Sequence, residues 1–418
     1  MLFIMKMGIK NVLRNKRRTT LTMTGIGVIV FALVAMQAWI VGILNNWIDN
    51  TINMSSGHIR VINKKYLKQE KILPIHYSIE HLNKVIKTIE EDKQVIRLQP
   101  RIRFGAQMEY NDLTIDCLGT AVDPKYEITT RRMKEYIIKG SYWENNLAGI
   151  GNGIIIGYKT AEELGVKVGD EVSLLVRTAD FSPYLLVYKI RAIYKSGFTS
   201  EDKGAFYIHI NDAADLLNMQ NSATEILVMI QDKYASKTVA ADLIAQFKKE
   251  GIDSKITAVP WQEHQGMGRL INTTYSFSVI MFLVFSIVAG LTILNTMLMT
   301  IFERTREIGM MQALGMKRRT TVLTIISEAL TMGLVGGIIG GGIGALVSYF
   351  FLEKIGLNFE KIMETYSGWY IDPIMRGDFQ FNQYLIGIIF GVLLSGLASI
   401  YPAVRASKLK PVVALRTI

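Results

Sequence analysis

Cysteine is almost absent from this chain of 418 residues, since Cys117 is the only one. No disulfide can form within the chain, so each folded part depends on its own apolar core. Several signatures of chemistry are missing as well: the sequence has no GxxxxGK[ST] nucleotide loop, HExxH, GxSxG or paired cysteine motif. These absences predict that the chain is not an enzyme and has no Walker-type nucleotide site of its own.

Histidine is also scarce, and the five histidines are scattered along the sequence. They are His58, His76, His81, His209 and His264. Zinc sites draw their ligands from characteristic His and Cys spacings, and none occurs here. We therefore expect no metal centre, and the Glu263–His264 pair is interpreted as a surface or linker position.

Charged residues are missing, or nearly so, from four long segments. These are Leu21–Leu44, Tyr275–Phe302, Thr320–Leu352 and Tyr384–Val404. Each exceeds the roughly 20 residues that a helix needs to cross a bilayer. The first segment is also longer than the roughly 7–15 apolar residues of a signal peptide, so we expect it to stay uncleaved. The sequence predicts four transmembrane helices.

The distribution of charge predicts the orientation. Lys and Arg dominate the residues before the first helix, the segment 303–319 and the tail, which places all three in the cytoplasm by the positive-inside rule. The large segment 45–274 would then lie outside. It holds 29 Lys or Arg and 28 Asp or Glu, so it is nearly neutral and gives no support for nucleic-acid binding.

The predicted organisation follows from these assignments. The parts are a cytoplasmic interfacial helix 1–20, membrane helices 21–44, 275–302, 320–352 and 384–404, an outside domain 45–274, a cytoplasmic coupling helix and loop 303–319, a short outside loop 353–383 and a cytoplasmic tail 405–418.

The outside domain contains two segments with the same strand–helix–strand pattern. The predicted elements are Gly57–Asn63, Ile79–Glu90 and Val95–Met108, then Thr224–Gln231, Ala235–Lys249 and Ser254–Val259. Between them, roughly Asn111–Asp215, short strands predominate, at Gly153–Tyr158, Glu171–Arg177, Tyr184–Ile193 and Ala205–Ile210. We predict an α+β domain of two β-α-β units with an inserted β-rich subdomain.

The third membrane segment is rich in glycine at intervals of four residues, which favours close helix packing. The glycines are Gly333, Gly336, Gly337, Gly340, Gly341 and Gly344. A hinge or sliding surface is the alternative use of such a stripe. Glu328 lies in the same segment, where a carboxylate is costly; a structural hydrogen bond and a role in a transport cycle both remain open.

The segment 303–319 alternates in charge directly after an apolar run, which favours a short amphipathic helix that a soluble partner can bind. Together with YPAVRASKLKPVVALR (401–416) and NVLRNKRRTTLT (11–22), its sequence ERTREIGMMQALGMKRR resembles the permeases of the MacB/FtsX type of ABC transporter. The size of the outside domain and SSGHIRV (55–61) are most similar to the LolC/LolE branch. That branch has a long hairpin where Thr178–Tyr184 here is short.

The resemblance implies a multi-pass permease of the bacterial inner membrane with cytoplasmic termini and a periplasmic domain. It implies two copies of a separate ABC ATPase that bind ATP and Mg, and a second permease, either itself or a homologous chain; this chain would bind no cofactor. It further implies extraction of lipoproteins for a periplasmic carrier. MacB-like efflux of peptide, antibiotic or glycolipid, and FtsX-like regulation of cell-wall hydrolases without transport, are the alternatives.

Two sets of site residues follow from the resemblance. The expected ATPase-coupling residues are Glu303, Arg304, Arg306, Glu307, Gly309, Met310 and Leu314. The expected substrate-binding surface, near the outer end of the first helix, is Met36, Trp39, Ile40, Ile43, Leu44 and Trp47. Methionine adapts to flexible acyl chains and tryptophan suits the headgroup zone. An ordinary lipid-facing surface with an aromatic belt explains the second set equally well.

Overall fold

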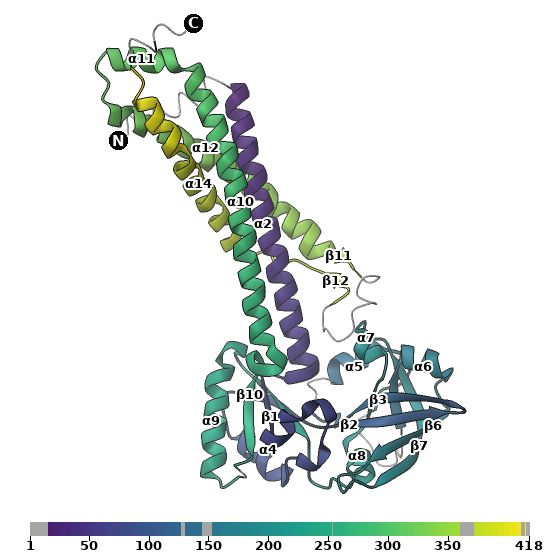
Figure 1. The fold of residues 1–418 in the computed structure, drawn as a ribbon. Coiled ribbons are helices and arrows are strands. Elements are labelled where there is room, and N and C mark those ends of the chain that lie inside the picture. Colours follow the sequence, from purple (N-terminus) through teal and green to yellow (C-terminus); the bar gives the residue numbers. More distant parts are fainter. Residues whose placement is uncertain are drawn as a thin grey trace. The chain divides into compact units, whose positions relative to one another are not determined.

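The computed structural model describes residues 16–126, 130–143, 153–252, 254–359, 372–410 and 414. The chain forms two compact units (Figure 1). The first, here the helical unit, contains Met1–Asn45, Ile271–Asn358 and Ile374–Ile418; the second, the sheet unit, contains Asn46–Leu270 and Phe359–Pro373. The predicted interfacial helix lies almost wholly outside the described residues, as do most of the tail after residue 410 and part of the loop 353–383.

Four helices in the described part of the chain are long and apolar enough to cross a membrane, as predicted. They are α2 (Lys16–Thr51), α10 (Met267–Glu303), α12 (Arg318–Val347) and α14 (Phe381–Ser407). Helix α2 continues past Leu44 and ends in a π-helical turn, η1 (Ile52–Ser56), and α12 continues into η6 (Ser348–Ile355). The membrane helices are therefore longer than their uncharged segments.

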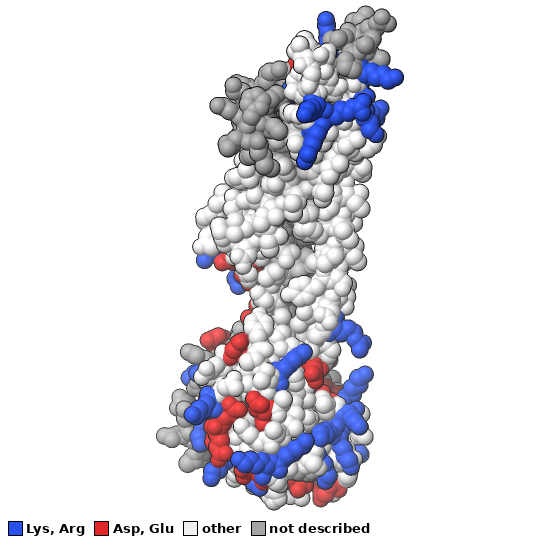
Figure 2. Space-filling model, turned by 90° about the vertical axis from the view of Figure 1, so that its left-hand side faces the viewer, with Lys and Arg blue, Asp and Glu red and all other residues white. Residues whose placement is uncertain are grey.

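The helical unit has its own apolar core. Ile26, Val30 and Val34 of α2 pack with Ile293 and Met297 of α10 and with Ala329 and Met332 of α12. On the face shown in Figure 2, the surface of the helical unit is almost free of charge between its ends, while Lys and Arg gather at the end that carries the α10–α12 connection. This distribution is that of a bundle surrounded by lipid.

The sheet unit is built on one sheet that has ten strands in the described residues. They are β1 (Ile59–Asn63), β2 (Val95–Tyr110), β3 (Leu113–Val122), β4 (Ile137–Gly140), β5 (Gly153–Gly157), β6 (Glu171–Arg177), β7 (Pro183–Tyr194), β8 (Ala205–His209), β9 (Glu225–Ile230) and β10 (Ile256–Pro260). Their order is β10-β1-β9-β2-β3-β8-β5-β7-β4, and β6 pairs with β2 and β7. A separate two-stranded ladder in the helical unit pairs β11 (Leu357–Asn358) with β12 (Ile374–Met375).

Shorter helices connect these strands. They are α3 (Lys64–Lys68), α4 (Leu82–Glu90), α5 (Thr130–Tyr136), α6 (Tyr158–Leu164), α7 (Thr199–Asp202), α8 (Ile210–Leu216) and α9 (Ser236–Lys249), with 3₁₀ turns η2 (Glu70–Ile72), η3 (Ile75–Tyr77), η4 (Lys233–Ala235) and η5 (Trp261–Gly266).

The two predicted β-α-β units are present, and they interlock. Strand β9 lies antiparallel between β1 and β2, while β1 lies antiparallel between β9 and β10. Each β-α-β unit is thus split by a strand of the other, which is the ferredoxin-like arrangement. Residues of α4 and α9, such as Val85, Ile89 and Leu243, pack with Ile59 and Val228 of the sheet in one core.

The predicted β-rich insertion is also present, between β2 and β9. Its core contains residues from Ile102 to Met219. Strand β2 is long enough to belong to both cores, so the insertion extends the sheet instead of forming a separate one. The turn between β6 and β7 is closed by a hydrogen bond from the Thr178 amide to the Ser182 carbonyl at 2.9 Å, so this hairpin is short.

Candidate functional site

The connection from α10 to α12 carries the predicted coupling residues. Helix α10 ends at Glu303, Arg304 has a non-helical backbone (φ −101°, ψ 14°), and α11 (Thr305–Ala313) follows. Gly315 then adopts φ +96°, which a residue with a side chain rarely does, and α12 begins at Arg318. Breaks on both sides thus set α11 apart as a short separate helix.

The predicted coupling residues divide into exposed and buried groups. Leu314 is 84% exposed and Met310 52% exposed, and Glu303 and Arg306 are exposed too. Ile308 and Gly309 face inward, and Gly309 lies directly against Ala414. Two large, exposed apolar side chains beside charged residues are typical of a surface that another protein covers.

Arg304 and Glu307 make contacts within the chain. Arg304 Nε donates to Glu307 Oε2 at 3.1 Å, and Arg304 Nη1 lies 3.2 Å from Glu328 Oε2 on α12. Glu328 therefore forms an ion pair with Arg304.

The predicted substrate surface on α2 is only partly accessible. Met36, Trp39, Ile40 and Ile43 are half-buried, whereas Leu44 and Trp47 are buried.

The six glycines of α12 form two ridges that contact different helices. Gly336, Gly340 and Gly344 lie against α2, and Gly340 meets the backbone of Gly27 there. Gly333, Gly337 and Gly341 lie against α14, near Gly391, Ile388 and Tyr384. Each ridge permits one close helix crossing.

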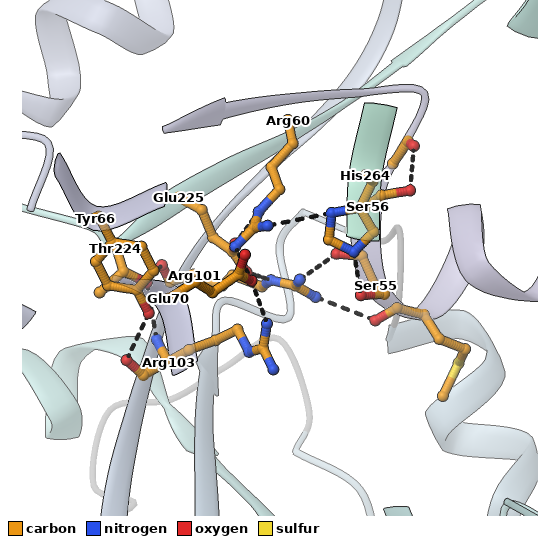
Figure 3. Close-up of polar contacts among 12 residues, drawn as sticks. Ser55, Ser56, Arg60, Tyr66, Glu70, Arg101, Arg103, Thr224, Glu225 and His264 are labelled. Atoms are coloured by element: carbon orange, nitrogen blue, oxygen red, sulfur yellow. Dashed lines mark hydrogen bonds and ion pairs between the residues drawn. The ribbon is translucent and has the colours of Figure 1, made fainter. Parts of the chain in front are cut away.

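The sheet unit contains a buried polar cluster that sequence reasoning missed (Figure 3). On β2, Arg101 lies directly opposite Glu225 of β9. On β1, the residue opposite Glu225 is Ile62, and Arg60 precedes Ile62 by two residues. The pleat therefore brings both guanidinium groups to one face of the central strand. Arg60 Nε and Arg101 Nε each pair with one oxygen of Glu225, and all three side chains are at most 3% exposed.

The polar cluster continues through a second carboxylate. Glu70 Oε1 lies 2.7 Å from Arg60 Nη2 and 3.4 Å from Arg103 Nη1. Ionic groups at this depth are tolerated because each charge meets an opposite charge and further hydrogen bonds.

The polar cluster holds the chain segments next to both long helices. In η1, which follows α2, the Met54 carbonyl accepts from Arg101 Nη1 at 3.1 Å, and the Ser55 carbonyl accepts from Arg101 Nη2. In η5, which precedes α10, His264 Nδ1 lies 3.2 Å from Arg60 Nη1, while its Nε2 lies 3.1 Å from Ser55 Oγ. The end of α2 and the start of α10 are thus fastened to the same central strands.

His264 is the position where the sequence interpretation was wrong. The sequence predicts a surface or linker position for this residue, but it is 3% exposed. Burial, and then the positive charge of Arg60, lower the pKa of His264 to about 4. The imidazole is neutral at pH 7, so Nδ1 can accept from Arg60 while Nε2–H donates to Ser55.

The lowered pKa predicts acid sensitivity of the sheet unit. The unfolded imidazole binds a proton near pH 6.5 and the folded one only near pH 4. Between these values the unfolded state holds more protons, so stability is full above pH 6.5 and falls as the pH decreases. We expect His264 to account for a loss on the order of 3 kcal/mol between pH 7 and 4.

Urea-dependent proteolysis of the full chain at several pH values measures this loss. His264→Gln should have a shallower dependence of stability on pH between 4 and 6.5 than the wild type. If the curves of unfolding free energy against pH are parallel for the two proteins, His264 is not the source of the acid sensitivity, whatever the absolute difference in stability.

No group of three or more His, Cys, Asp or Glu side chains is placed to hold a metal ion within the described residues.

Sequence comparisons match this architecture to known proteins. Residues 19–246 match the MacB-like periplasmic core domain, and residues 279–411 match the FtsX-like permease C-terminal family. The chain is 25% identical to the macrolide export ATP-binding/permease protein MacB of Bdellovibrio bacteriovorus, over 98% of the chain and 61% of that protein. It therefore spans less than two thirds of the length of that relative.

Two further relatives are similar over different extents. An uncharacterized ABC transporter permease of Methanocaldococcus jannaschii is 23% identical over 99% of this chain and 97% of its own length. The lipoprotein-releasing system transmembrane protein LolC of Xylella fastidiosa is 21% identical over 63% of this chain and 64% of its own.

Among solved structures, the periplasmic region of MacB from Actinobacillus actinomycetemcomitans has 8% identity and a TM-score of 0.37, over 54% of this chain and 96% of that one. The first family match alone covers more than half of the sequence, and the second runs from within α10 through α12 and α14. The chain is a membrane protein that belongs to the MacB/FtsX/LolC family of ABC transporter permeases.

Proposed function

We propose that this chain is the permease subunit of an ATP-driven exporter whose energy comes from a separate ABC ATPase. The observation that carries the proposal is the exposed apolar surface of the connection between α10 and α12, formed by Met310 and Leu314 with Arg306 beside them. ATP and Mg would be bound by the ATPase, in two copies, and a second permease would complete the unit. The termini and this connection would face the cytoplasm of a bacterial inner membrane.

The architecture supports a mechanical role for the permease. Helices α2 and α10 continue from the helical unit into the sheet unit along the chain, and the polar cluster holds the adjoining segments η1 and η5. A shift of either helix along its axis would therefore pull on the central strands β1, β2 and β9. The sheet unit would convert this movement into release of cargo on the outer side.

For the cargo, we propose a lipoprotein that enters from the outer leaflet beside α2. Met36, Trp39, Ile40 and Ile43 are the accessible part of the expected surface and offer soft, apolar contacts to acyl chains. Leu44 and Trp47 are buried, so they do not belong to the accessible part. The short β6–β7 hairpin argues that a periplasmic carrier is not recruited by this turn.

MacB-like efflux of a peptide, antibiotic or glycolipid is the second candidate. It is favoured by the extent of the similarity, since the MacB alignment covers 98% of the chain and the LolC alignment 63%. Purification of the chain from its native membrane, with identification of what copurifies by mass spectrometry, separates the candidates. An ATPase with triacylated proteins supports lipoprotein extraction, an ATPase with a periplasmic adaptor supports efflux, and an ATPase with a cell-wall hydrolase supports regulation without transport.

Leu314→Glu should reduce copurification of the ATPase by about tenfold, because a carboxylate would be buried in an apolar interface. The side chain is 84% exposed, so the permease itself should fold normally. Ile72→Glu is the matched control, since Ile72 is 73% exposed on the sheet unit. Equal recovery of the ATPase with both variants would refute the proposed docking surface.

A further inference from the structure

Arg304 is the centre of a small ionic group that links three helices of the helical unit. Its Nε lies 3.1 Å from Glu307 Oε2 on α11, and its Nη1 lies 3.2 Å and 3.4 Å from the two oxygens of Glu328 on α12. Its own backbone closes the last turn of α10, because the Arg304 amide donates to the Thr300 carbonyl at 3.2 Å. One residue therefore connects the end of α10 through its backbone with α11 and the interior of α12 through its side chain.

The ionic group is shielded from water. The side chain of Arg304 is 14% exposed and that of Glu328 10% exposed. Arg306, two residues later, is exposed instead. Arg304 precedes α11 and its side chain reaches Glu328 on α12, whereas Arg306 lies in the first turn of α11 and is exposed on the surface that a partner would cover.

An apolar cavity of about 340 Å³ lies beside the ion pair. Its wall includes Met297, Met310, Met311 and Met316, together with Arg304 and Glu328. Flexible methionine side chains can repack when a neighbouring helix moves. Helix α11 thus has room to shift, while the ion pair is its polar link to α12.

We propose that the Arg304–Glu328 pair passes movement of α11 to the membrane helix α12, so that Arg304 is a positioning residue rather than an ATPase contact. The inference rests on the proposed function, in which α11 receives the movement of an ATPase. In this proposal, Glu328 is the group on α12 to which Arg304 transmits the movement. Arg306, Met310 and Leu314 remain the groups that the partner touches.

Charge reversal tests the pair. Arg304→Glu, Glu328→Arg and the double exchange are compared in nanodiscs, in complex with the ATPase that copurifies with the wild-type chain. Each single reversal should lower the ATP hydrolysis of the complex about tenfold without reducing copurification. The double exchange should restore at least half of the wild-type rate, since the link is re-formed with opposite polarity.

Arg306→Glu is the matched control, because the exposed side chain should affect copurification itself and should not be rescued by Glu328→Arg. A double exchange no more active than the single reversals would overturn the inference while leaving the proposed function intact. A wild-type chain that binds no ATPase would refute the proposed function and the inference with it.

If a charge-reversal variant does not purify as a single species, neutral variants test the ion pair instead. Glu328→Gln retains the shape of the side chain, Arg304→Gln shortens it, and both remove the ion pair. They should lower the hydrolysis rate with copurification unchanged, and wild-type rates in both would overturn the inference.

Discussion

Replacing Glu225 by alanine is expected to lower the free energy of unfolding of the sheet unit by about 3–5 kcal/mol, because two buried guanidinium groups would lose their shared carboxylate. Burial alone would raise the pKa of Glu225, but Arg101 and Arg60 lower it to about 2. The carboxylate is therefore charged throughout the physiological range. A change of this size is a large part of the stability of a typical domain, about 5–15 kcal/mol.

Proteolysis of the detergent-solubilised full chain at increasing urea concentration measures the effect. The matched control is Glu163→Ala, which removes a surface pair whose Lys203 Nζ–Glu163 Oε2 distance is 3.2 Å and whose side chains are 56% and 45% exposed. Such pairs contribute about 0–1 kcal/mol. If Glu225→Ala and Glu163→Ala lose similar amounts of unfolding free energy, the polar cluster does not stabilise the sheet unit more than a surface ion pair does.

Gly340→Ala should separate α2 from α12 and destabilise the helical unit by about 3 kcal/mol. A Cβ atom on Gly340 would overlap the carbonyl group of Gly27, and backbone cannot move aside as a flexible side chain can. Gly342→Ala is the control, because a Cβ at Gly342 meets no atom within 4 Å among the described residues.

The comparison holds helix propensity constant, since both variants replace glycine by alanine in the same helix. The measurement is the temperature at which the purified chain loses its monodisperse peak on size-exclusion chromatography. A similar temperature for both variants would contradict close packing of α2 on α12.

The periodic parts of the fold could be predicted from the sequence. The four membrane helices follow from uncharged length, and β6 has the bounds expected from its alternating pattern, Glu171–Arg177. Helix α4 starts at Leu82 instead of Ile79, because Ile79 pairs with Ala223 and His81 adopts φ +51°. Such a start depends on a bridge to a residue more than a hundred positions away, which local periodicity cannot reveal.

The polar cluster was not predicted, although its strands contain a signal for it. Arg60 interrupts the apolar strand β1, and Glu225 begins the apolar run of β9, whereas Arg101 lies between Gln99 and Arg103 on β2 and does not stand out. Opposite charges inside strands that are otherwise buried indicate that they pair with each other. His264 gave no signal, since its burial depends on a 3₁₀ turn between a strand and a helix, a context without periodicity.

The interlocked strand order also determines when the sheet unit can form during synthesis. Strand β1 is made early, but both of its neighbours, β9 and β10, come from the end of the unit. Contacts this distant in sequence form slowly and leave apolar strands open in the meantime. The ribosome must therefore reach the start of α10 before the sheet closes, so the nascent chain depends on protection from aggregation until then.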